Sequence, residues 1–262
     1  MMGPAHSLSG AMAWLGVGLA AAWADNPMPW PVLLTGALIC AGAALAPDLD
    51  QKNATISRAF GPFSRWLGAF IDKLSVTVYN ATRGRQDRRR TGGHRTLTHT
   101  WIWAVLIGVG FSAAAIYWGR WAVLIILFIH MVLAVEGLLW RMARPSSDVL
   151  VWLLGAASAW ILADILDKPG NGATWLFDDQ PYLWIGLPII LGSIVHTLGD
   201  SLTISGCPMF WPLSIKGRRW YPAGTPSFMR FRAGSKVENA VLMPVFMAVS
   251  GICGAGALYL AA

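Results

Sequence analysis

Long apolar stretches constrain the fold of this chain more than any other feature of its sequence. Hydrophobic residues make up 55% of its 262 residues and charged residues only 13%, whereas roughly a quarter of a soluble protein is charged. A helix needs about 20 apolar residues to cross a bilayer. We therefore predict an all-α, polytopic transmembrane helical bundle with about seven spans. The apolar stretches are residues 8–24, 30–47, 100–118, 121–140, 148–166, 182–203 and 239–261.

The distribution of basic residues predicts the orientation of these spans. Lysine and arginine dominate residues 51–99 and 216–236, whereas Asp178 and Asp179 outnumber Lys168 between the fifth and sixth spans. By the positive-inside rule, both basic loops face the cytoplasm and the aspartate-containing loop faces outward. Seven spans with a cytoplasmic N-terminus satisfy these assignments.

We expect residues 1–262 to form a single domain with a basic cytoplasmic insertion at about 51–95, and this insertion has two parts. In residues 56–79, apolar residues recur at helical spacing, which predicts an amphipathic helix on the bilayer, interrupted at Gly61-Pro62. The arginine-rich run at 83–90 lacks interleaved aromatic residues and any nucleic-acid-binding fold. We therefore expect it to bind anionic lipid headgroups, and we expect no nucleic-acid partner.

The positions of the tryptophans and cysteines predict structural roles for both residue types. The three cysteines, Cys40, Cys207 and Cys253, have no paired spacing, so we expect them to be packing residues. Several of the 15 tryptophans lie at the ends of predicted spans, as interfacial anchors do. These are Trp30, Trp101, Trp118, Trp121, Trp140 and Trp184.

Histidine and aspartate gather in four short motifs, which carry the candidate chemistry. Neutral imidazole and carboxylate are ligands for divalent metals, and burying such groups without a partner is costly. The predicted topology brings all four motifs to the cytoplasmic face, although they are far apart in sequence. The motifs are His6, Pro47-Asp48-Leu49-Asp50, Gly93-His94-Arg95-Thr96-Leu97-Thr98-His99 and His196-Thr197-Leu198-Gly199-Asp200.

Spacing within two of the motifs favours a metal site. His196 and Asp200 are four residues apart, so a helix would present both on one face. Asp48 and Asp50 would repel each other without a cation or proton between them. Asp50 could bridge metals or act as a base, and the sequence does not separate these roles.

The third motif leads into a predicted span. Thr96 or Thr98 could cap that helix, which would place His99 in its first turn. Because helix N-termini favour anions, Arg95 is a candidate for binding a substrate phosphate. The alternative is that Arg95 only contributes to the positive charge that sets topology.

Together these residues resemble the YdjM family of bacterial inner-membrane, metal-dependent hydrolases. The family pattern combines an N-terminal histidine, Pro-Asp-x-Asp, Gly-His-Arg-x-x-x-His-[Ser/Thr], and His-x-x-x-Asp followed by Gly-x-Pro-x-x-Trp-Pro. The resemblance covers roughly residues 1–215 and implies an inner-membrane location. It is also the main reason for including His6 among the candidate ligands. The matching positions are His6, 47–50, 93–100, 196–200 and 206–212.

The ligand types are also similar, more distantly, to those of zinc-dependent phospholipase C and trinuclear-zinc nucleases. Resemblance to these phosphodiesterases implies one to three zinc ions and a phosphate ester as substrate. Their further His-x-x-x-Glu is not matched, because His130 and Glu136 have a different spacing. Glu136 is a candidate ligand or general base, and His130 is either a ligand or a hydrogen-bonded packing residue.

The leading hypothesis is a membrane-bound hydrolase that cleaves a phosphate ester of a lipid or lipid-linked substrate at the cytoplasmic face. Asp50 and Glu136 are its candidate catalytic residues, and Arg95 is its candidate substrate-binding residue. One alternative is a divalent metal-ion transporter, whose site would lie nearer the bilayer midplane. Another is a non-catalytic scaffold that binds a partner through residues 83–90. The candidate metal ligands are His6, Asp48, Asp50, His94, His99, His196 and Asp200.

Overall fold

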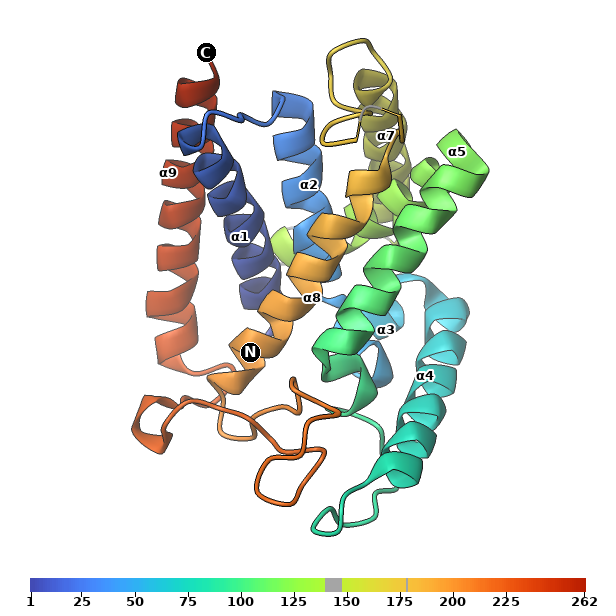
Figure 1. Ribbon diagram of the computed structural model, residues 1–262, viewed down its shortest axis with the longest axis vertical. Coiled ribbons are helices and arrows are strands. Elements are labelled where there is room, and N and C mark those ends of the chain that lie inside the picture. Colours follow the sequence, from blue (N-terminus) through green and yellow to red (C-terminus); the bar gives the residue numbers. More distant parts are fainter. Residues whose placement is uncertain (140–147, 178) are drawn as a thin grey trace.

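The computed structural model describes residues 1–139, 148–177 and 179–262, and the described part is a bundle of helices with loops at both ends (Figure 1). This confirms the predicted all-α class. Trp140 and Asp178, which entered the predictions above, lie outside the described residues. The helices are α1 (Gly3–Trp23), α2 (Trp30–Ala43), α3 (Ile56–Ala59), α4 (Gly61–Thr82), α5 (Trp101–Leu138), α7 (Asp148–Leu166), α8 (Gly186–Ser201) and α9 (Met243–Ala261). Shorter turns are η1 (Ala46–Asp50), η2 (Leu97–His99), η3 (Leu183–Ile185), η4 (Ser227–Met229) and η5 (Glu238–Leu242).

Five helical segments in the described part are long and apolar enough to cross a membrane. These segments are Trp30–Asp50, Trp101–Leu138, Asp148–Leu166, Leu183–Ser201 and Glu238–Ala261. Helix α1 has 21 residues, but its glycine- and serine-containing sequence is less apolar and it is not among the five. It still lies within the bundle, where it packs against α2, α8 and α9.

Helix α5 accounts for two of the seven predicted stretches. As a straight helix its 38 residues would be about 57 Å long, nearly twice the thickness of the hydrocarbon core. The backbone instead breaks at Gly119, where φ is 57° and ψ is −140°. The second arm runs back along the bundle, because Arg120 at its start contacts Asp167 whereas Gly137 near its end lies against Ser7 of α1. The seven apolar stretches thus correspond to α1, α2, the two arms of α5, α7, α8 and α9.

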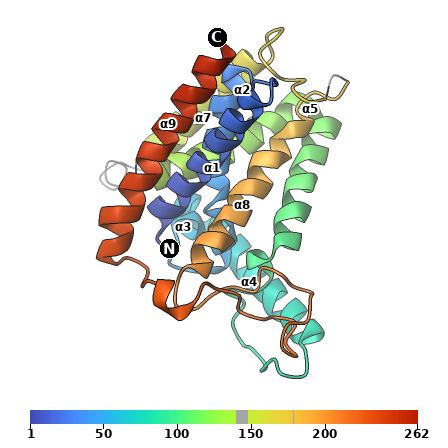
Figure 2. The ribbon, with the colours of Figure 1, turned by 60° about the vertical axis from the view of Figure 1, so that its left-hand side comes forward.

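The two basic loops lie together at the end of the bundle where the chain begins (Figures 1 and 2). The Asp87 carboxylate joins them, because it accepts hydrogen bonds from the backbone N–H groups of Gly84 (2.8 Å), Arg219 (3.0 Å) and Trp220 (3.3 Å). The loop between α7 and η3 lies at the opposite end, in agreement with the predicted relative topology. Which end faces the cytoplasm stays a prediction.

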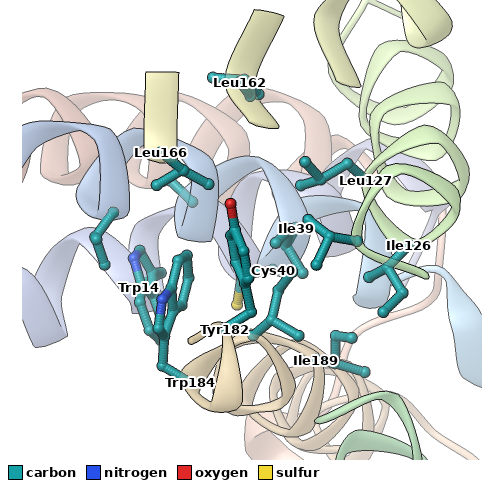
Figure 3. Packing of buried hydrophobic residues seen from close by; sticks show 14 of the residues in the cluster. Trp14, Ile39, Cys40, Ile126, Leu127, Leu162, Leu166, Tyr182, Trp184 and Ile189 are labelled. Carbon is teal, nitrogen blue, oxygen red and sulfur yellow. The ribbon is translucent and has the colours of Figure 1, made fainter. Parts of the chain in front are cut away.

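Buried apolar side chains of α1, α2, α5, α7 and α8 form the core of the bundle (Figure 3). Trp184 is part of this core: it is fully buried, it stacks against Trp14, and its indole N–H donates to the Gly172 carbonyl. The prediction that Trp184 is an interfacial anchor is therefore wrong. Trp30, Trp118 and Trp121 are exposed, as anchors would be.

The predicted amphipathic segment is present as α3 and α4, with the interruption at Gly61-Pro62. Gly61 has a φ of 59° and begins the second helix. On α4, Phe63, Trp66 and Phe70 are 63%, 65% and 54% exposed, and their rings form a continuous row. Contact of this row with lipid stays a prediction.

Helices α8 and α2 pack closely against each other beside the site, and the importance of this packing for stability can be tested. A Cβ atom added at Gly192 would lie 2.4 Å from the Cys40 carbonyl oxygen, so the two helices would have to separate. We expect Gly192→Ala to destabilise the protein by about 1–3 kcal/mol. The measurement is thermal unfolding in detergent. Gly251→Ala is the matched control, because nothing lies within 4 Å of that position, and equal melting temperatures for the two variants would contradict the prediction.

Candidate metal centre

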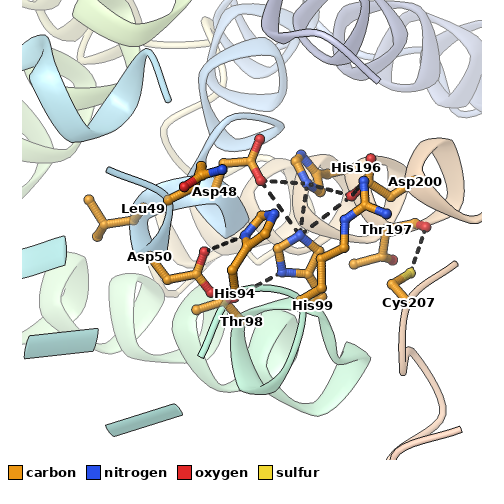
Figure 4. Close-up of polar contacts among 12 residues, drawn as sticks. Asp48, Leu49, Asp50, His94, Thr98, His99, His196, Thr197, Asp200 and Cys207 are labelled. Carbon is orange, nitrogen blue, oxygen red and sulfur yellow. Dashed lines mark hydrogen bonds and ion pairs between the residues drawn. The ribbon is translucent and has the colours of Figure 1, made fainter. Parts of the chain in front are cut away.

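Side chains of the predicted histidine and aspartate motifs meet in one cluster, in which Asp48 and Asp50 lie beside His94, His99, His196 and Asp200 (Figure 4). Each motif comes from a different element, so the site depends on the tertiary fold. The contributing residues are His6 from α1, Asp48 and Asp50 from η1, His94 and Arg95 from the loop before η2, His99 from η2, and His196 and Asp200 from α8. The convergence expected from the loop charges is therefore present in the structure.

Two local details differ from the predictions. Helix α1 begins at Gly3, so His6 lies on the helix and does not precede it. Helix α5 is capped by Thr100, whose hydroxyl accepts from the Trp103 N–H at 3.2 Å. Thr96 and Thr98 are therefore not the cap, and His99 lies in the turn before α5, not in its first turn.

Four ligand atoms lie close together: His99 Nε2, His196 Nε2, Asp48 Oδ1 and Asp200 Oδ2. The two nitrogens are 3.3 Å apart. Each lies 3.6 Å from Asp48 Oδ1, and they lie 3.6 and 3.8 Å from Asp200 Oδ2. In a tetrahedral zinc site with bonds of about 2.0–2.1 Å, neighbouring ligand atoms are about 3.3–3.4 Å apart. Asp48, His99 and His196 form one group, and His6, His196 and Asp200 form a second group that shares His196; the ligand atoms within each group all lie within 4.8 Å of one another, so each could hold a divalent metal.

Hydrogen bonds fix the orientation of both central imidazoles. His196 Nδ1 donates to the Ala44 carbonyl at 2.7 Å. The Thr98 hydroxyl donates to Asp50 Oδ2 at 2.8 Å, so its oxygen is free to accept from His99 Nδ1 at 2.9 Å. Because Nδ1 is the donor in both rings, Nε2 is the nitrogen that would bind a metal at the centre, as in metal-ligating histidines.

Asp50 and His94 lie beside the four-atom group and not within it. The two oxygens of Asp50 contact His94 Nδ1 (2.9 Å) and the Thr98 hydroxyl (2.8 Å). The His94 ring meets the edge of His99, and its side chain is 35% exposed. Thr98 was not predicted as a site residue, although its position next to His99 was a usable signal. Its hydroxyl connects Asp50 to His99.

His6 lies against the centre without hydrogen bonds of its own. It is fully buried, and neither ring nitrogen has a hydrogen-bond partner within the described residues. Its ring stacks on His196 with the centroids 3.8 Å apart, and Nε2 lies 3.4 Å from Asp200 Oδ1. A buried imidazole whose Nδ1 lacks a partner and whose Nε2 has only this long contact is costly, which points to a ligand at this position.

Charged side chains at the centre lie in direct contact with one another. Arg95 Nη2 lies 2.8 Å from Asp200 Oδ2, and Nη1 donates to Thr203 at 3.2 Å. Burial alone would lower the pKa of His99, but hydrogen bonds to Asp200 and Asp48 and the charge of Asp50 raise that pKa to about 9.

The one cysteine beside the centre is a neutral thiol at physiological pH. Burial, and then the charge of Asp200, raise the pKa of the Cys207 thiol to about 12. Its Sγ donates to the Thr197 carbonyl at 3.1 Å. Cys207 therefore serves as a hydrogen-bonded packing residue, which extends its predicted packing role.

His130 and Glu136 are not brought into the cluster. Both lie on the second arm of α5. His130 is buried, donates to the Ile126 carbonyl at 2.7 Å and packs edge-on against Phe111. The Glu136 carboxyl group interacts electrostatically with Asp148 and Arg58, and neither of these residues belongs to the cluster. The geometry thus supports packing for His130, and a catalytic role for Glu136 stays a prediction.

Comparison with known proteins gives one match. The sequence profile described as YdjM inner membrane protein matches residues 1–258, so it extends beyond the motif region to the last helix. No curated protein and no solved structure matches the chain.

Proposed function

The chain belongs to the YdjM inner membrane protein family, and from that premise we propose that it is a metal-dependent hydrolase of phosphate esters. The observation that carries this proposal is the spacing of Asp48, His99, His196 and Asp200, whose ligand atoms are 3.3–3.8 Å apart in the measured pairs. Two imidazoles with carboxylates at this spacing form a ligand set that suits zinc. The hydrogen bonds that orient His196 and His99 through the Ala44 carbonyl and the Thr98 hydroxyl support the same assignment.

We assign Asp48, His99 and His196 as the permanent ligands. Asp200 is the exchangeable one, because it is the member of the group that is paired with a guanidinium, Arg95, at 2.8 Å. Arg95 can hold the carboxylate when its oxygen leaves the centre, and a catalytic zinc site keeps one position open for water or substrate. When bound, the metal supplies a water of lowered pKa and stabilises charge on phosphoryl oxygens. His6 is a further candidate ligand, because its ligand atom lies within 4.8 Å of those of His196 and Asp200.

The remaining polar residues have supporting roles in this proposal. Asp50 positions His94 directly and His99 through Thr98. His94 borders the centre from the solvent side, so we assign it to substrate contact. The substrate phosphate would approach from the end of the bundle with the basic loops, which we infer to be cytoplasmic from the positive-inside rule.

The location of the centre favours this function over metal transport. The ligands come from the turns η1 and η2 and from the last turns of α8, at one end of the bundle. Transport sites usually lie near the bilayer midplane between broken helices. A flux assay in proteoliposomes, with phosphoesterase activity measured on the same preparation, distinguishes the two functions.

The proposal is tested on protein purified in detergent. Elemental analysis is expected to find bound zinc, and anomalous X-ray scattering is expected to locate it between His99 and His196. Hydrolysis of phosphodiester and phosphomonoester lipids is expected to stop with chelator and to return with zinc. Protein that neither retains zinc after reconstitution nor cleaves any of these esters would refute the proposal.

A further inference from the structure

A cavity of about 370 Å³ lies next to the centre, between the two basic loops. Its wall includes the end of α4 and parts of the segments 86–95, 205–208 and 218–222. Four arginines line it: Arg88, Arg90, Arg95 and Arg218. Its volume falls in the range of small-molecule sites, and no lysine is among its lining residues.

The positive charge of this cavity is largely uncompensated. Asp87 also lines it, but its carboxylate already accepts three backbone N–H groups. Within the described residues, Arg88, Arg90 and Arg218 form no ion pair with a carboxylate. Guanidinium groups bind phosphate through paired, planar hydrogen bonds, so three of them around one cavity indicate a phosphorylated ligand.

A second observation also points to a ligand. Trp220 lines the cavity and is only 4% exposed, and its indole N–H has no hydrogen-bond partner within the described residues. A buried N–H without an acceptor costs free energy. A ligand oxygen that reached this N–H from the cavity would satisfy it.

Arg95 connects the cavity to the centre. It lines the cavity and also contacts Asp200 at 2.8 Å. Its backbone has a φ of 56°, which is uncommon for a residue other than glycine, and the Arg90 guanidinium donates to its carbonyl at 3.4 Å. A ligand in the cavity would therefore reach the centre at Arg95 and extend toward the other three arginines.

We propose that this cavity binds a diphosphate, so that the substrate carries a second phosphate beyond the one at the metal centre. This inference rests on the proposed hydrolase function. It assigns Arg88, Arg90 and Arg218 to the second phosphate and Trp220 to an additional hydrogen bond. The substrate class is then a diphosphate ester, and its organic part is either a lipid or a soluble group.

The test compares two double variants of the full-length protein in detergent. Arg88→Gln with Arg218→Gln removes two arginines that line the cavity. Arg85→Gln with Arg89→Gln removes the same charge from exposed positions of the basic loops outside it. Binding of inorganic pyrophosphate is measured by calorimetry in EDTA, so that metal chelation by pyrophosphate contributes nothing.

We expect pyrophosphate to bind at least ten times more tightly than inorganic phosphate. Its affinity should fall at least tenfold in the cavity variant and less than twofold in the control. Equal affinity for phosphate and pyrophosphate, or equal losses in the two variants, would overturn the inference. If this happens while zinc binding and phosphoesterase activity persist, the proposed function stands and only the diphosphate site fails.

Two organic diphosphates identify the source of the ligand. Farnesyl diphosphate in the same micelles represents a lipid, and ADP represents a soluble ester. If one of the two compounds binds more tightly than the other, and its affinity falls at least tenfold in the cavity variant, the result supports the diphosphate site. The compound that binds more tightly identifies the class of the organic part. Binding of neither compound would overturn the assignment of a diphosphate ester as substrate.

Discussion

Replacing His196 by alanine is expected to remove zinc from the protein and to abolish phosphoesterase activity. His196 Nε2 lies within 3.3–3.8 Å of His99, Asp48 and Asp200, and its Nδ1 is held by the Ala44 carbonyl. Structural zinc sites bind with about 10–16 kcal/mol. If one of four ligands contributes about a quarter of that, roughly 2.5–4 kcal/mol, zinc binding weakens about 70- to 1,000-fold. The measurements are zinc content after dialysis against a competing chelator, and activity at limiting zinc.

His130→Gln is the matched control for this experiment. His130 is also a buried histidine of a membrane helix, but it hydrogen-bonds only to the carbonyl of its own helix and packs against Phe111. We expect this variant to lose some thermal stability while keeping its zinc. Full zinc retention in His196→Ala would contradict the assigned centre. Loss of zinc from both variants would indicate a general effect on folding.

The position of the site was predictable from the sequence because two of its determinants are local. The length of an apolar stretch decides whether it can cross a bilayer, and the charge of a loop decides on which side it stays. These properties place His6, Asp48, His99 and His196 at one end of the bundle without any knowledge of packing. The reversal of α5 was also detectable, because Gly119 separates two stretches of span length.

The roles of individual residues were not predictable, because they depend on directions that spacing does not determine. Asp48 and Asp50 are two residues apart in a 3₁₀ turn, which has about three residues per turn. Their side chains therefore point in different directions, Asp48 toward His99 and His196, and Asp50 toward His94 and Thr98. Trp184 was misassigned for a similar reason, since an aromatic residue at the end of a span can face lipid or the core.

The second large effect is expected for Asp50→Asn. An asparagine of the same shape has one accepting oxygen and one donating NH2 group, so it cannot accept from both His94 and Thr98 as the aspartate does. Loss of the Thr98 bond would release the orientation of His99, and outer-shell changes of this kind typically weaken metal binding about 10–100-fold. At saturating zinc, however, the variant should still bind the same number of ions as the unmodified protein, because the four ligand atoms remain.

Asp48→Asn, two residues away in the same turn, separates a positioning role of Asp50 from direct ligation. Asp48 Oδ1 lies 3.6 Å from both His99 Nε2 and His196 Nε2, so this variant should bind zinc much more weakly than Asp50→Asn when both are titrated with zinc against a chelating dye. Equal losses of affinity would mean that Asp50 is itself a ligand, as its sequence motif allowed. A smaller loss of affinity in Asp50→Asn, together with an unchanged number of bound ions, would mean that Asp50 orients His94 and His99 without binding the metal. The carboxylates that bind the metal would then be Asp48 on η1 and Asp200 on α8. Of these two, Asp200 would leave the metal when substrate binds, because it is paired with Arg95.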